Sequence, residues 1–159
     1  MTKIQDLKLD FYSEYVKYYE ESIRFYAHPA EVDFKLNATF NGNGYTIKEL
    51  IQGENGVYFF EMWRGHSEGL FSELHGLLIK ESLKNFPRFF LSWVKCEGWN
   101  FEELSEEISK KDIIWLKNSL EIIIENLSTD DMDKDCFINL NIFLDFVIKN
   151  NWSLHISEN

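Results

Sequence analysis

The stretch Trp63–Ser82, with the sequence WRGHSEGLFSELHGLLIKES, places two histidines and three glutamates within twenty residues. When residues are placed at about 100° each, the large apolar side chains of this stretch fall within a sector of about 120°. They are Leu70, Phe71, Leu74, Leu77 and Leu78. A stripe of this width is typical of a helix that packs one side on a core, so residues 67–81 are predicted to form an amphipathic helix.

The same stretch carries two histidines, and their spacing argues against a metal site. His66 and His75 point to opposite sides of such a helix, about 13 Å apart along its axis. Helices that bind zinc place their ligands four residues apart, as in HExxH. His66-x-Glu68 matches the first half of a zinc deaminase signature, but the PCxxC half is absent. We therefore expect these residues to lie on the flank and near the start of a helix, and we predict no metal or cofactor.

Downstream of this stretch, helix-starting residues recur at short intervals. The predicted helices begin at Pro87 (PRFFLSWVKC), at Asn100-x-x-Glu103, after Ser109-x-x-Asp112 (through IIWLKNSLEIIIENL) and after Ser128-Thr129-Asp130 (DMDKDCFINLNIFLDFVIKN). Short connections between successive helices predict antiparallel hairpins that lie side by side.

Upstream, the patterns are mixed. Asp10–Ala27 places its aromatic and aliphatic residues in one wide sector and is predicted to be a helix. Val32–Phe40 alternates apolar and polar residues as a half-buried strand does, and NGNG at 41–44 favours a hairpin turn. Thr46–Glu49 has capping-box spacing and predicts a short helix, TIKELI. Val57–Trp63 can be a buried strand or a helix, because periodicity alone does not separate the two.

These patterns predict a mainly α protein. A chain of 159 residues is expected to form one domain, 1–159, that buries roughly 70% of its unfolded surface. We expect antiparallel helical hairpins with a small β element near residues 32–63.

Several functional classes lack their sequence signals. The N-terminal residues contain no apolar segment of a signal peptide, and no run approaches the roughly 18 apolar residues of a membrane span. Cys96 and Cys136 form no CxxC pair and read as buried thiols of a cytoplasmic protein. The chain contains no GxxxxGK[ST], GxGxxG or GxSxG, and no basic patch for nucleic acid. These absences favour a non-enzymatic role without membrane or direct nucleic-acid binding.

The charge is distributed unevenly. The net charge is −11, and residues 97–135 carry 12 acidic and four basic side chains, a net −8. Asymmetry of this kind indicates an electrostatic partner, although a solvated face that promotes solubility has the same composition. Asp131-x-Asp133-x-Asp135 matches the start of an EF-hand loop, but Cys136 stands where glycine is needed, so no calcium site is predicted.

The function predicted from these observations is an inhibitor or immunity-type protein that binds a basic protein partner, possible targets being nucleic-acid-acting toxins or enzymes. Its predicted binding residues are Glu102, Glu103, Glu106, Glu107, Trp115, Asp130, Asp131 and Asp133. Trp115 projects from the side of its helix that is opposite the main apolar stripe, so it is either sandwiched between layers or an exposed anchor. The alternative is a small-ligand binder or enzyme with a pocket around Trp63, Arg64, His66 and Glu68.

Overall fold

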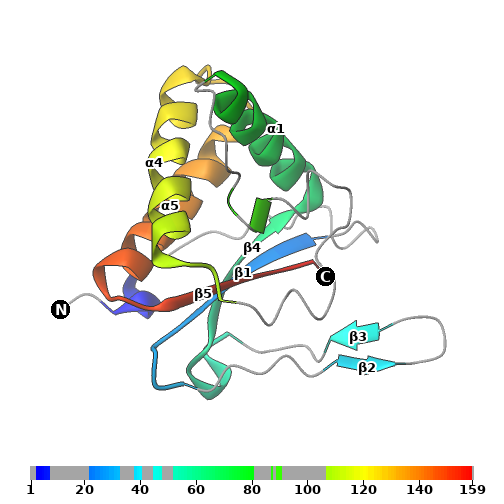
Figure 1. Ribbon diagram of the computed structural model, residues 1–159, viewed down its shortest axis with the longest axis vertical. Coiled ribbons are helices and arrows are strands. Elements are labelled where there is room, and N and C mark those ends of the chain that lie inside the picture. The colour runs from blue at the N-terminus through cyan, green and yellow to red at the C-terminus, as the bar shows by residue number, and fades with distance from the viewer. Residues whose placement is uncertain are drawn as a thin grey trace.

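The computed structural model describes residues 3–7, 22–32, 38–40, 45–47, 52–80, 87, 89–90 and 107–158. Its elements follow one another along the chain as η1 (Ile4–Leu7), β1 (Ser22–His28), β2 (Ala38–Phe40), β3 (Tyr45–Ile47), η3 (Glu54–Gly56), β4 (Tyr58–Trp63), α1 (Arg64–Lys80), α4 (Lys110–Asn126), α5 (Lys134–Lys149) and β5 (Ser153–Glu158). Figure 1 shows α1, α4 and α5 together on one side of a sheet formed by β1, β4 and β5.

The sheet is antiparallel, and β1 is its central strand. The strand order is β4-β1-β5, and Phe25 of β1 lies opposite Phe60 of β4 and Ile156 of β5. The strand β4 runs directly into α1, whereas β5 follows α5. The helical part of the described chain is therefore inserted between the two outer strands of one sheet, and β5 returns to pair with a strand from near the start of the chain (Figure 1).

All seven residues of β1 are buried, so both faces of the central strand are covered. Because successive side chains of a strand point to opposite faces, Ile23, Phe25 and Ala27 share one face. These three belong to the main core, together with their cross-strand partners Met62, Phe60, Leu154 and Ile156. The opposite face of β1 carries Ser22, Arg24, Tyr26 and His28, here called the polar face of β1.

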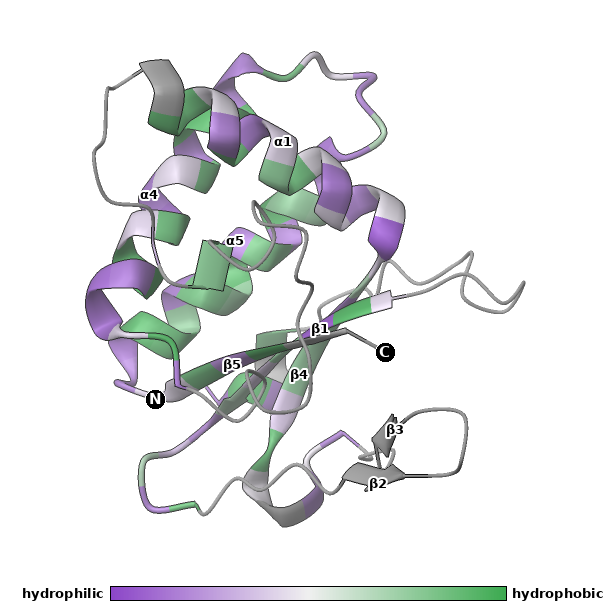
Figure 2. Ribbon diagram, turned by 45° about the vertical axis from the view of Figure 1, so that its right-hand side comes forward, coloured by the Kyte–Doolittle hydropathy of each residue, from purple (hydrophilic) through white to green (hydrophobic). Residues whose placement is uncertain are grey.

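The helices cover the apolar face of the sheet. In α1, Leu70, Phe71, Leu74 and Leu78 are buried and Leu77 packs against the core, which confirms the amphipathic helix predicted over 67–81. The predicted start of α4 is also confirmed, because Ser109 Oγ accepts a hydrogen bond from the Asp112 amide at 3.2 Å. Figure 2 shows apolar residues concentrated on the inner sides of α4 and α5.

The helices α4 and α5 are antiparallel neighbours, as their short connection predicts. At one end, Lys134 Nζ donates to the Leu127 carbonyl at 3.1 Å. At the other end, Lys110 Nζ donates to the Trp152 carbonyl at 3.0 Å, just beyond α5. None of the helices described has the length and apolarity that crossing a bilayer requires.

The prediction of a mainly α fold is wrong: the described chain is a mixed α/β structure with a three-stranded antiparallel sheet. The helix predicted over Asp10–Ala27 is wrong at Ser22–Ala27, which belongs to β1, and residues 10–21 lie outside the described ranges. The error has a physical cause, because a strand buried on both faces shows little alternation and a wide aromatic sector fits a helix equally well.

The strand β5 was not predicted at all. Its sequence, SLHISE, places Leu154 and Ile156 on the core face and Ser153 and His155 on the other, an alternation of period two. The stretch is short and follows a strongly apolar helix, so its signal is weak without the pairing to β1. The predicted last helix itself is confirmed, beginning at Lys134.

The β element predicted near residues 32–63 is partly confirmed. The strands β2 and β3 form an antiparallel pair in which Phe40 lies opposite Tyr45, flanking the predicted turn at 41–44, which lies outside the described residues. Thr46 and Ile47 belong to β3, so the helix predicted from Thr46 is wrong there. Within the ambiguous stretch Val57–Trp63, residues Tyr58–Trp63 form the strand β4, which pairs with β1 rather than with a strand from its own region.

Other predictions remain untested. The helices predicted from Pro87 and Asn100 fall mostly on residues outside the described ranges, although Phe89 and Phe90 are helical and buried. The single-domain organisation over 1–159 stays a prediction.

Leu154→Ala tests the role of β5 in the core. Leu154 is fully buried opposite Ala27, so its truncation should lower the free energy of unfolding by about 2–5 kcal/mol. Ile142→Ala, at an exposed position of α5, is the control and should change it by about 0.5 kcal/mol or less. Urea unfolding of both variants provides the measurement, and equal effects would contradict the placement of β5 against the core.

Candidate functional site

The structure separates the predicted acidic residues. Glu107 is exposed just before α4, whereas Asp130, Asp131 and Asp133 follow the opposite end of that helix. A helix of 17 residues is about 25 Å long, so these two groups do not form one compact cluster. Glu102, Glu103 and Glu106 lie outside the described residues.

Asp133 and Asp131 act as structural residues in the turn between α4 and α5. Asp133 Oδ1 accepts a hydrogen bond from His66 Nδ1 at 2.7 Å, and the Asp133 amide donates to Asp131 Oδ1 at 2.9 Å. Asp133, one of the predicted binding residues, is therefore paired within the protein. Its carboxylate joins the first turn of α1 to the start of α5.

This contact, here called the His66–Asp133 joint, brings together one residue from each of the two predicted sites. The His66 side chain is 3% exposed and that of Asp133 is 21% exposed. The Trp63 ring meets the His66 ring edge-on, with centroids 5.5 Å apart and planes at 88°. The indole also lies so close to Gly65 that a Cβ there would collide with it. Such packing fixes the orientation of the imidazole and explains a histidine in the interior.

The side chains of the predicted pocket, Arg64, His66 and Glu68, do not point toward one common site. Arg64 and Glu68 form an ion pair of 3.5 Å in which each side chain is almost half exposed. His66 points into the interior toward Asp133 instead. The structure therefore places the charged pair and the imidazole in different environments, one in solvent and one in the core.

Trp115 is half-buried. It packs against the main core, and its ring lies 6.3 Å from that of Phe89 with the planes at 57°. Ile122, seven residues further along α4, is exposed. Of the two alternatives for Trp115, this placement is nearer to the sandwiched residue than to the free-standing anchor.

The exposed apolar residues come from two neighbouring helices and the turn between them. Among the described residues, the large hydrophobic side chains that are exposed all lie on α4, on α5 or in the turn between them, with exposed fractions from 36 to 62%. They are Ile114, Ile122, Met132, Ile138 and Ile142. We refer to the outer sides of α4 and α5 with their connecting turn as the α4–α5 face.

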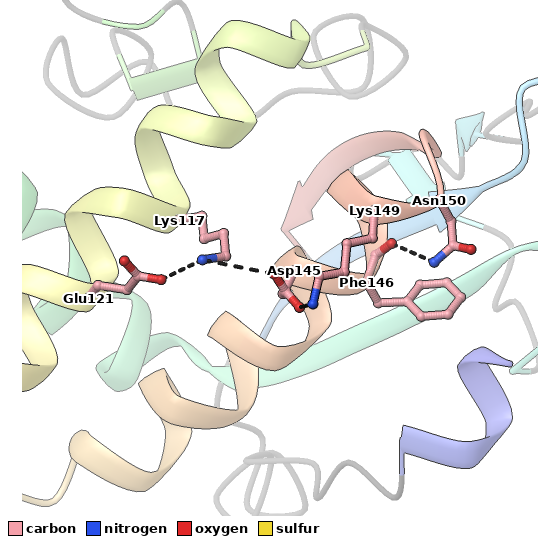
Figure 3. A network of polar contacts seen from close by, with 6 residues as sticks. All are labelled: Lys117, Glu121, Asp145, Phe146, Lys149 and Asn150. Atoms are coloured by element: carbon pink, nitrogen blue, oxygen red, sulfur yellow. Dashed lines mark hydrogen bonds and ion pairs between the residues drawn. The ribbon is translucent and has the colours of Figure 1, made fainter. Parts of the chain in front are cut away.

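Two lysines of this face, Lys117 and Lys149, form ion pairs. Figure 3 shows Lys117 between Glu121 of its own helix and Asp145 of α5, and Lys149 bound to Asp145 at 2.7 Å. These are surface pairs of small energetic weight, typically about 0–1 kcal/mol each. Their effect on the electrostatic potential of the face is larger, because they neutralise the positive charges of Lys117 and Lys149.

Three exposed carboxylates remain on the same face. They belong to Glu125, Asp130 and Asp135, and no described lysine or arginine forms an ion pair with them. The end of the face that includes the turn is therefore acidic, and it surrounds the exposed Met132.

Metal chemistry finds no support in the part of the chain that the structure describes. No three His, Cys, Asp or Glu side chains there are grouped so that they could hold an ion. In the EF-hand-like sequence Asp131-x-Asp133-x-Asp135, the Asp133 carboxylate is hydrogen-bonded to His66. Cys136 is fully buried in α5, and Cys96 lies outside the described residues.

The feature that sequence analysis missed is the polar face of β1. Ser22 Oγ donates to Glu61 Oε1 at 2.9 Å, and Arg24 lies 3.5 Å from Glu61 Oε2. All the members of this face are buried, and burying polar groups is unfavourable unless they are well hydrogen-bonded. The alternation in SIRFYAH is the sequence signal that could have located them, once the segment is taken as a strand.

At the other end of this face, two buried histidines meet. His28 Nδ1 donates to the Pro29 carbonyl at 2.8 Å, and His28 Nε2 lies 3.2 Å from His155 Nε2. The ring planes are nearly parallel at 16°, but the 5.3 Å between centroids exceeds the distance between the nitrogens by about the two ring radii. The two Nε2 atoms therefore lie within hydrogen-bonding distance of each other.

Comparison with protein-family models, with curated proteins and with solved structures finds no match to this chain. Functional inference therefore rests on the residues of the protein itself.

Two glycines of α1 test the His66–Asp133 joint. A Cβ at Gly69 would lie 2.5 Å from Asp133 Oδ2, whereas one at Gly76 meets nothing within 4 Å. Gly76→Ala should stabilise the protein by about 0.5–1 kcal/mol, because alanine is the better helix former. Gly69→Ala should lose that gain and destabilise the protein by about 1–3 kcal/mol, because it displaces a carboxylate that is hydrogen-bonded to a buried partner. Thermal unfolding measures both, and equal stabilisation would contradict the joint.

Proposed function

We propose that the protein is a non-enzymatic acidic interaction protein, an inhibitor or immunity-type protein, whose α4–α5 face binds a basic protein partner. The observation that carries this proposal is that exposed large apolar residues of the described chain lie on the same helices and turn as the exposed carboxylates of Glu125, Asp130 and Asp135. Protein interfaces combine an apolar centre with a polar rim, and this face has both components.

The turn between α4 and α5 is the part of the face that is best suited to bind a basic partner. Met132, the most exposed of the apolar residues at 62%, lies between Asp130 and Asp135 in sequence. A cationic surface that binds at this turn would contact both the carboxylates and the apolar side chain. Charges arranged in this way steer association, and apolar contacts of this kind slow dissociation.

The turn is also well supported from behind. The Asp131 amide donates to the Ser128 carbonyl at 3.1 Å, and the His66–Asp133 joint holds the end of the turn against α1. A partner would therefore bind a surface that is already ordered, which reduces the entropy lost on binding. This support makes Asp131 and Asp133 unsuitable for substitution, since their replacement would alter the turn itself.

The charge of the face can be tested with Glu125→Gln/Asp130→Asn. Both side chains are exposed, so the free energy of unfolding should change by less than about 1 kcal/mol. The partner is first captured on the immobilised protein from an extract of the native host and purified. Its association rate should then fall at least fivefold for the variant at low salt, and less at high salt, because electrostatic steering is screened.

The matched control for this experiment is Glu31→Gln/Glu54→Gln. It removes the same charge near η3 and in the turn after β1, at the bottom of Figure 1, whereas the α4–α5 turn is at the top. The association rate of this control should remain close to that of the wild type. Equal loss in both variants would indicate a response to net charge alone, and unchanged association in the first variant would refute the acidic face.

Met132→Ala tests the apolar part of the face. Because the side chain is mostly exposed, the melting temperature should stay within experimental error. Dissociation of the captured partner should become about tenfold faster if Met132 is an anchor of the interface. Met132→Leu retains the apolar volume and should bind as the wild type does. Unchanged dissociation of Met132→Ala would remove Met132 from the interface.

A further inference from the structure

The polar face of β1 contains a buried arginine whose hydrogen-bonding capacity is not used. Arg24 is 9% exposed, and its Nε is a buried donor without a hydrogen-bond acceptor among the described residues. A guanidinium carries five N–H donors in a fixed planar arrangement and stays charged in proteins. A buried donor without an acceptor destabilises the folded state, so the burial of Arg24 requires an explanation.

The contacts of Arg24 hold the guanidinium in place. Its Cζ lies 4.4 Å from the centre of the Phe59 ring, a cation–π arrangement in which the ring covers the guanidinium. Glu61, opposite Arg24 in the register of β1 and β4, approaches Nη2 at 3.5 Å. Strand pairing and ring packing therefore orient the group before any ligand is bound.

The ion pair with Glu61 does not complete this arrangement. Charge-assisted N–H···O bonds are usually about 2.7–2.9 Å long, which is shorter than the 3.5 Å found here. The other carboxylate oxygen, Oε1, accepts a hydrogen bond from Ser22 at 2.9 Å, so the Glu61 carboxylate is shared between Ser22 and Arg24. The Nε of Arg24 is thus a buried donor that has no acceptor among the described residues.

We propose that Arg24 is the anchor of a binding site for an oxyanion, a carboxylate or phosphate group of a small ligand, which accepts from Nε. The chemistry follows from the donor set, because planar guanidinium edges match the oxygens of carboxylates and phosphates. The neighbouring Tyr26–Phe59 pair, with centroids 5.9 Å apart, would border the remainder of such a ligand. This site lies on the opposite face of the sheet from the helices and is independent of the α4–α5 face.

The test uses the Nε–Hε signals of the arginines in nuclear magnetic resonance spectra. The sequence contains three arginines, Arg24, Arg64 and Arg88, so the spectrum is simple to assign with variants. Inorganic phosphate and acetate are titrated separately into the full-length protein, with sodium chloride at equal ionic strength as the reference. We expect a saturable shift of the Arg24 signal with at least one oxyanion and no saturable shift with chloride.

Two variants separate binding from folding. Arg24→Met removes the guanidinium and should abolish saturable binding of the oxyanion, measured by calorimetry or by the rise in melting temperature. Arg64→Met is the matched control, because Arg64 also forms a 3.5 Å pair with a glutamate but is exposed, and it should bind as the wild type does. Arg24→Lys keeps the charge but lacks the planar edge and should bind at least tenfold more weakly.

Each outcome decides the proposal. If Arg24→Met does not fold, the titration of the wild-type Arg24 signal still answers the question. The proposal is overturned if neither phosphate nor acetate moves that signal saturably, which would make Arg24 and Glu61 a structural pair only. Equal loss of binding in Arg24→Met and Arg64→Met would also overturn it, since the response would then reflect net charge.

Discussion

The structure depends on the pairing of β1 with two strands that are distant from it in sequence. Each residue of β1 is buried, and its backbone hydrogen bonds are completed by β4 on one side and by β5 on the other. A central strand without one of its neighbours would bury backbone groups that have no partner, which is costly. The apolar face that α1, α4 and α5 cover exists only when all three strands are in register. The helical layer therefore depends on the sheet, although the helices contain most of the regular structure.

The His66–Asp133 joint links the two candidate regions. It connects the first turn of α1, which β4 positions, to the turn that precedes α5. The close approach of α1 to this turn also requires a glycine at position 69. The joint thereby converts two residues that look functional in sequence into a structural contact, and it orders the turn in which Met132 is presented. In this way a buried contact contributes to the surface on which the proposed function rests.

The two faces of the sheet have different chemical characters. The face toward the helices is apolar, whereas the other face of β1 carries an ion pair, a histidine pair and several hydroxyl groups. Polar groups at this depth must be satisfied by one another or by a ligand. Glu61, Ser22 and the two histidines satisfy one another, and Arg24 does so only in part. That difference within one face is the reason for assigning a ligand to Arg24 rather than to the histidines.

The local features of this protein can be predicted from its residue pattern alone. The helices over Arg64–Lys80, Lys110–Asn126 and Lys134–Lys149 follow from apolar stripes and from the cap at Ser109, because helical hydrogen bonds join residues four apart in the chain. The acidic character of the segment 97–135 is likewise a property of composition. Three further features became visible only in the folded chain: Ser22–His28 and Ser153–Glu158 are neighbouring strands, Asp133 is hydrogen-bonded to His66, and Arg24 is buried beside Glu61. Strands and buried polar contacts are made between residues far apart in the chain, so no local pattern specifies the partner.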